Sequence, residues 1–161
     1  MDRLFEAIAD RLEDKIPELK WIDWEAGQID YQDEEYPFQF PCCFIDIEGV
    51  EWGNVGERLM IGKATVNLRV CFDIYEDFNN KSPDRKHALK HLRLINKIQK
   101  HIQHFSGEHF NQLNKVRTFP DKRADQYKCI NLVYQCGIRD NFGMVDYEKV
   151  KATPKIAVQL K

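Results

Sequence analysis

Apolar and polar residues alternate without a break along residues 64–74. Even-numbered positions from Ala64 to Ile74 are apolar, and the positions between them, including Arg69 and Cys71, form the other set. Successive side chains of a β-strand point to opposite faces, so this pattern predicts a strand with one buried face and one face in water. Its eleven residues exceed the usual strand length of about five or six. Residues 129–139 alternate in the same way and predict a second long strand.

Two other stretches repeat apolar residues at helical spacing, with charged residues on the opposite side. Residues 2–16 predict a first helix that Asp2 can cap. Residues 83–105 predict a second helix, with Ser82 before it as a cap and Gly107 after it as a stop. Each helix therefore packs by one side only, as it would against a sheet.

The remaining segments predict shorter strands and connections. Residues 42–47 follow two prolines and predict a strand that begins there or lies at an edge. Residues 113–119 predict a weaker strand, and residues 120–126 a polar tip. Residues 48–62 contain four glycines and predict a long connecting loop, which in a compact domain is usually functional or mobile.

The order is helix, strand, strand, helix, strand, strand. It predicts an α+β fold with a mostly antiparallel sheet of four or five strands and two helices packed on one face. Residues 1–140 are expected to form a single domain. Residues 141–161 are expected to form a C-terminal tail or arm, in which residues 156–160 could add a short strand.

Composition narrows the function classes. The 161 residues suggest one domain, and the 43% hydrophobic fraction fits a globular protein. The net charge of −2 argues against a general nucleic-acid binder, which needs a strong basic field. We find no signal peptide and no run near the ~18 apolar residues of a membrane span, so a cytosolic protein is expected.

Five cysteines fall in predicted strands: Cys42, Cys43, Cys71, Cys129 and Cys136. An odd number in a chain of this size is not typical of a disulfide framework. They are interpreted as buried free thiols in a reducing compartment. Cys42 and Cys43 are adjacent and would point to opposite faces of one strand, so they cannot bind one metal side by side.

No catalytic, cofactor or metal site is predicted. His87 and His91 share a helix face, as do His101 and His104, but no third ligand stands at a recognisable spacing. His91 is interpreted as a boundary residue whose ring packs on the sheet. The acidic residues between 30 and 35 are interpreted as a solvated or partner-facing loop. Phosphate-binding and nucleophile motifs are absent, so an enzyme is not expected.

Large apolar side chains in the predicted 48–62 loop suggest a partner surface, although the loop could instead fold back on the sheet. Trp52 is the most prominent of them. Basic residues gather around the third and fourth predicted strands and are interpreted as a solvated face, with an acidic partner as the alternative. These basic residues are Lys115, Arg117, Lys122, Arg123 and Lys128.

The order of these segments resembles that of phage tail terminator proteins, also called tail-completion or minor tail proteins. The likeness extends over about residues 1–140 and is one of pattern, since that family has no catalytic signature. The segments that carry it are LFEAIADRLEDKIPELKWID, FPCCFIDI, GKATVNLRVCFDIY, HALKHLRLINKIQKHI and DKRADQYKCINLVYQCGIRD.

The resemblance implies a structural assembly protein of a phage or prophage. Such proteins form a ring, usually of six subunits, which caps the tail tube and presents a surface to the head. The implied partners are other copies, the tail tube and head–tail connector proteins, with no membrane and no specific nucleic-acid binding. The implied location is the host cytoplasm during assembly and then the virion tail. The implied interface residues are Trp52, Asn54, Val55, Arg58, Leu59, Asp121, Lys122 and Arg123.

The sequence leaves two alternatives open. One is a non-catalytic adaptor or regulatory domain that dimerises through its sheet. The other is a small enzyme that uses His87, His91 or a cysteine.

Overall fold

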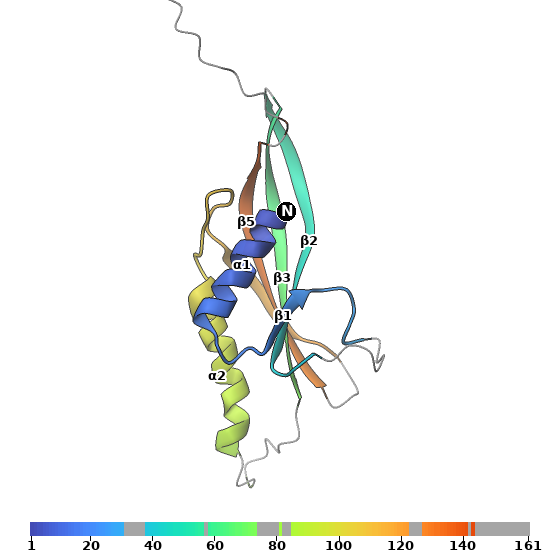
Figure 1. The fold of residues 1–161 in the computed structure, drawn as a ribbon, viewed down its shortest axis with the longest axis vertical. Coiled ribbons are helices and arrows are strands. Elements are labelled where there is room, and N and C mark those ends of the chain that lie inside the picture. The colour runs from blue at the N-terminus through green and yellow to red at the C-terminus, as the bar shows by residue number, and fades with distance from the viewer. Residues whose placement is uncertain are drawn as a thin grey trace, which may run out of the picture.

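A computed structural model gives the fold of the chain (Figure 1). It describes residues 1–30, 38–56, 58–73, 81, 85–122, 127–141 and 143, apart from the side chains of three residues at the start of the second helix. The elements are α1 (Asp2–Lys15), β1 (Trp21–Trp24), β2 (Cys42–Gly56), β3 (Leu59–Asp73), α2 (Arg85–Ile102), β4 (Asn114–Pro120) and β5 (Tyr127–Asp140).

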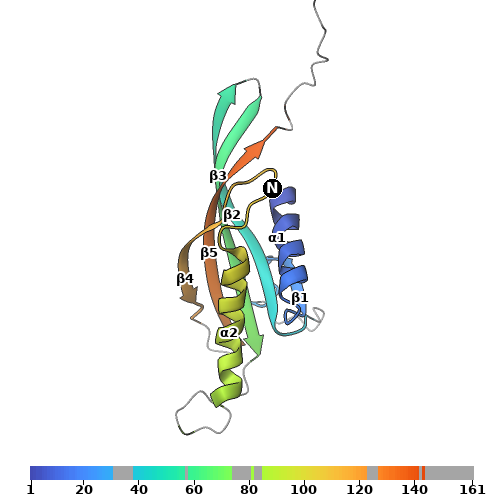
Figure 2. The ribbon, with the colours of Figure 1, turned by 90° about the vertical axis from the view of Figure 1, so that its left-hand side faces the viewer.

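The described strands form one sheet in the order β1-β2-β3-β5-β4. β1 is parallel to β2, and every other neighbouring pair is antiparallel. Both helices lie on the same face of this sheet (Figure 2). The predicted α+β class and mostly antiparallel sheet are therefore confirmed. β1 was not predicted, because its four residues are too few to show an alternation.

The main core lies between the helices and the sheet. Leu4, Ile8 and Leu12 of α1 are buried there together with Ile98 and Ile102 of α2. The sheet contributes its predicted apolar face, since Ala64, Val66, Leu68, Val70 and Phe72 are all buried. Burial of each large aliphatic side chain contributes roughly 1.5–3 kcal/mol, so this layer supplies most of the stabilising energy.

The alternation had predicted that the other face of the sheet lies in water, but part of that face is buried. Cys71 is fully buried, and only 13% of the Arg69 side chain is exposed. The chain around β1 folds over this end of the sheet and forms a second, smaller cluster. Ile29, Phe44, Phe38 and Phe40 belong to that cluster. Period-two patterning identified the helix-covered face but could not show that a distant segment covers part of the other.

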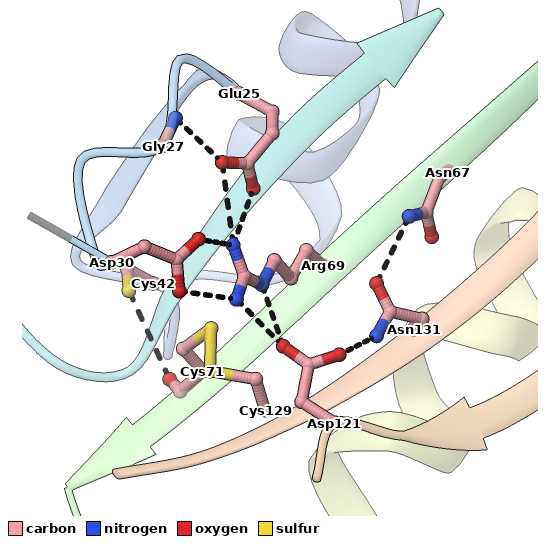
Figure 3. Close-up of a disulfide and its surroundings, with 10 residues drawn as sticks. All are labelled: Glu25, Gly27, Asp30, Cys42, Asn67, Arg69, Cys71, Asp121, Cys129 and Asn131. Carbon is pink, nitrogen blue, oxygen red and sulfur yellow. Dashed lines mark hydrogen bonds and ion pairs between the residues drawn. A yellow bond between two sulfur atoms is a disulfide. The ribbon is translucent and has the colours of Figure 1, made fainter. Parts of the chain in front are cut away.

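Three cysteines stand in a row on this second face. Cys71 of β3 is opposite Cys42 of β2 on one side and Cys129 of β5 on the other. Cys71 and Cys129 form a disulfide, with 4.1 Å between their Cα atoms (Figure 3). The expectation of five free thiols was therefore wrong, because the sequence does not show that these two positions share a register.

The remaining cysteines, Cys42, Cys43 and Cys136, are free and buried. Burial raises the pKa of Cys42 to about 12 and that of Cys136 to about 11. Both thiols are therefore protonated near neutral pH and are poor nucleophiles.

The expected loop over residues 48–62 is instead strand. β2 and β3 continue almost to their turn and pair from Cys42 and Cys71 to Gly56 and Leu59. Register shifts between Ile47 and Gly49 and near the turn interrupt the alternation. Because glycines are also typical of loops, the sequence predicted a loop here. α2 also ends earlier than predicted, at Ile102, because His104 has a left-handed φ of 62°.

Several predictions fall on residues that the structure does not describe. They include the short strand over 156–160, the helix start at 82–84 and most of the polar tip. Among the described residues, no helix is long and apolar enough to cross a membrane.

Candidate functional site

The paired ends of β2 and β3 project past the N-terminus of α1 and beyond the helices (Figure 2). We call residues 50–56 and 58–63 the hairpin arm. It carries large apolar side chains that water reaches: Trp52 is 39% exposed, Val55 57%, Met60 37% and Ile61 50%. A monomer rarely groups such residues without a partner for them, so the arm is the best candidate contact surface among the described residues.

Trp52 is held against the arm by the glycine opposite it. Gly62 pairs with Trp52 across the hairpin. A Cβ atom at Gly62 would lie 2.6 Å from Val50 Cγ1 and 2.8 Å from Trp52 Cε3, which is closer than real contacts allow. The missing side chain at Gly62 therefore leaves the space in which the indole of Trp52 rests.

The implied interface residues near the turn of the arm, which we call its tip, have different roles. Asn54 Oδ1 accepts a hydrogen bond from the Gly56 amide at 2.9 Å, so Asn54 shapes the turn. Arg58 has a left-handed φ of 65° and its side chain is exposed. Val55 is exposed, and Leu59 is half-buried. The tip thus presents Val55 and Arg58 outward, with Trp52 further down the arm.

A groove of about 640 Å³ lies at the base of the arm. Glu51, Ile61 and Lys63 line it from the arm. Residues 108–111 line it from the opposite side, where Arg139 N donates to His109 O at 2.8 Å. Its lining mixes both signs of charge with an exposed apolar side chain, which suits a protein surface better than a small charged substrate.

A cluster of charged residues lies near the end of β3 that is far from the arm, on the face of the sheet that carries the disulfide (Figure 3). Arg69 binds both oxygens of Asp30, with Nη1–Oδ2 at 2.7 Å and Nη2–Oδ1 at 2.9 Å. Its Nε donates to Asp121 Oδ2 at 2.8 Å, and its Nη1 lies 3.4 Å from Glu25. Asn131 donates to the second oxygen of Asp121. One guanidinium thus joins the segment after β1 to the end of β4.

Burial would lower the pKa of Arg69, but the hydrogen bonds that it donates to Asp30 and Asp121 more than offset this effect and raise that pKa above its ordinary value. Arg69 is therefore a fixed positive charge. Only 16% and 17% of the Glu25 and Asp121 side chains are exposed, whereas 46% of the Asp30 side chain is, so the cluster is a partly buried structural unit.

Two residues of the sequence predictions lie in this cluster. Asp30, interpreted as part of a solvated or partner-facing acidic loop, is 46% exposed and pairs with Arg69. Asp121, one of the implied interface residues, binds Arg69 as well, and its place at an interface stays a prediction. Lys122 is exposed, and Arg123 lies outside the described residues. The cluster depends on three acids that lie far from Arg69 in the sequence, and no local motif predicts that they meet it.

The structure does not bring all of the predicted interface residues together. The amide of Asp121 donates to the carbonyl of Cys129 at one end of β5, whereas the arm reaches the level of Asp140 at the other. At about 3.3 Å per residue, roughly 35 Å of strand separates the two groups. They are two surfaces, at opposite ends of one sheet.

The histidines whose side chains the structure describes form no assembled site, and the side chain of His87 lies outside the described residues. His91 packs edge-on against Phe72, with ring centroids 4.7 Å apart, as its boundary position predicted. His101 and His104 do not share a helix face, since the helix ends between them. Among the described residues, no group of three or more His, Cys, Asp or Glu is arranged to hold a metal ion.

The fold is similar to that of a chain in a solved structure described as the virion of a native gene transfer agent particle. The TM-score is 0.55 and the identity 8%, over 85% of this chain and 95% of that chain. At this identity the likeness establishes a shared fold. No protein-family model and no curated protein matches the sequence.

Proposed function

We propose that this chain is a structural assembly protein of a phage-like particle, and that it serves as a tail terminator: a ring, of six copies, that caps the tail tube and joins it to the head. The observation that carries the proposal is the fold shared with a virion chain along 95% of that chain's length. The order of elements that suggested tail terminators from sequence agrees with it.

The hairpin arm supports an assembly role. Its exposed apolar residues project from a sheet that two helices and two core layers already stabilise. They are therefore not needed to complete this chain's own core and are available to another protein. Aromatic and arginine side chains contribute most to such contacts, so Trp52 and Arg58 are the proposed anchors.

On this proposal the chain is non-catalytic and acts through surfaces that are complementary to its partners. The buried thiols of Cys42 and Cys136 are protonated near neutral pH, and the Arg69 guanidinium is paired with carboxylates of its own chain. These groups act in stability and not in chemistry.

A tail-capping assay tests the function. Tail tubes purified from the phage-like particle that encodes the chain would be mixed with the chain and viewed by negative-stain electron microscopy. A ring of density at one end of each tube, and tubes that no longer elongate when tail-tube subunits are added, are expected. Open ends and continued elongation at saturating protein would contradict the proposal.

A further inference from the structure

The sheet has two edges on which the structure places no further strand among the described residues. β1 pairs only with residues 42–45 of β2, which leaves the outer edge of residues 46–56 open. On the far side, β4 pairs with β5 through one edge and has no described strand on the other. The Lys115 amide donates to Gln103 Oε1 at 3.0 Å, so the open part of β4 begins at Val116. Open edges are templates for pairing with another chain.

The two edges carry opposite charge. Residues 46–56 contain Asp46, Glu48 and Glu51 and no basic residue, whereas β4 contains Lys115 and Arg117 and no acidic residue. Apart from the half-buried Asp46, these side chains are exposed. Two acidic edges, or two basic edges, would place like charges side by side, which is destabilising. The acidic edge and the basic edge attract each other.

Strand directions permit the same pairing. β2 and β5 run one way along the sheet, and β3 and β4 run the other way. If copies are related by rotation about an axis along the strands, β4 of one copy meets β2 of the next in antiparallel orientation. The helices of every copy then lie on the same side of the joined sheet.

From these observations we infer that copies of this chain join edge to edge, with β4 of one copy pairing antiparallel to residues 46–56 of β2 in the next. Such a contact uses different surfaces on the two partners, so its repetition gives a ring where the rotation between copies closes, and not a two-fold dimer. The inference rests on the proposed ring and supplies its subunit contact. Because β1 already pairs with residues 42–45, the β4 strand of the neighbouring copy must pair further along β2, toward the arm. Neighbouring copies are then staggered along the strand direction, as strands in closed sheets are.

Charge reversal with rescue tests the contact. One variant carries Lys115→Glu and Arg117→Glu on β4, and a second carries Glu48→Lys and Glu51→Lys on β2. Each should reduce the ring fraction seen by native mass spectrometry at least tenfold, because each makes both edges the same sign. Both pairs of changes in one chain should restore the ring, since the edges are again opposite.

A matched control carries Lys90→Glu and Arg93→Glu, which make the same charge change on exposed positions of α2. It should keep its ring, and circular dichroism should show all variants folded. Rings that persist in both single-edge variants, or that the combined variant does not restore while the control keeps them, would overturn the edge contact and leave the proposed function standing. A wild-type chain that forms no ring with or without tail tubes would overturn both.

Discussion

Arg69 on β3 and Asp30 in the segment after β1 form a bidentate ion pair, with N–O distances of 2.7 and 2.9 Å. Because Arg69 also binds Asp121 beyond the end of β4, this pair fixes segments that are far apart in the sequence. It therefore holds the end of the sheet opposite the hairpin arm.

Replacing Arg69 by methionine should destabilise the fold by about 2–4 kcal/mol. The change keeps the length of the side chain but leaves Glu25 and Asp121 mostly buried without their cation. Urea unfolding measures the effect. Lys97→Met is the matched control, because its pair with Glu18 is much more exposed and should cost at most about 1 kcal/mol. If both variants lose the same free energy of unfolding, the cluster stabilises the fold no more than an exposed ion pair does.

The cysteine pairing predicts a definite thiol count. If Cys71 and Cys129 are bonded and the other three are free, alkylation of the denatured, unreduced protein should add three groups. Reduction before alkylation should raise the number to five. Because the bond closes a separation of 58 residues, its removal in a Cys71→Ala, Cys129→Ala variant should cost about 2–4 kcal/mol. Five alkylated groups without reduction would disprove the pairing.

Stability should fall as the solution becomes alkaline. The pKa values of Cys136 and Cys42 are raised to about 11 and about 12 by burial, from an ordinary value of 9.0. The folded chain therefore holds these protons after the unfolded chain has lost them, and the stabilisation present below pH 9 is lost as the pH rises toward 11 and 12.

Urea unfolding at pH 8 and pH 10.5 measures this loss. Cys136→Ala should reduce the difference between the two pH values by about 2 kcal/mol, although it lowers stability somewhat at both. An unchanged difference would show that the Cys136 thiol is not the buried acid described here.

The arm can be tested apart from the fold. Trp52→Ala and Arg58→Glu should each reduce ring assembly about tenfold or more, because they remove the proposed anchors, while the melting temperature stays within a few degrees. Trp24→Ala is the control, since Trp24 is 40% exposed, packs on Phe5 and lies away from the arm. If assembly is unchanged in both arm variants, the arm is not the contact surface.

The sequence predicted what local patterning can encode. Alternation from Ala64 to Phe72 identified the helix-covered face of β3, and helical spacing identified α1 and most of α2. Pairings between distant segments were not predictable. The Arg69 cluster needs acids from positions 25, 30 and 121, and the disulfide needs the register between β3 and β5. Glycines and register shifts hid the hairpin arm, which became visible only once β2 and β3 were paired.

Native mass spectrometry over a concentration series, with and without tail tubes, is the decisive test of the proposed ring. A closed species of six copies is expected, with no dimer that accumulates as a stable intermediate. Monomers or dimers at every concentration, in the presence of tubes as in their absence, would contradict the assembly function.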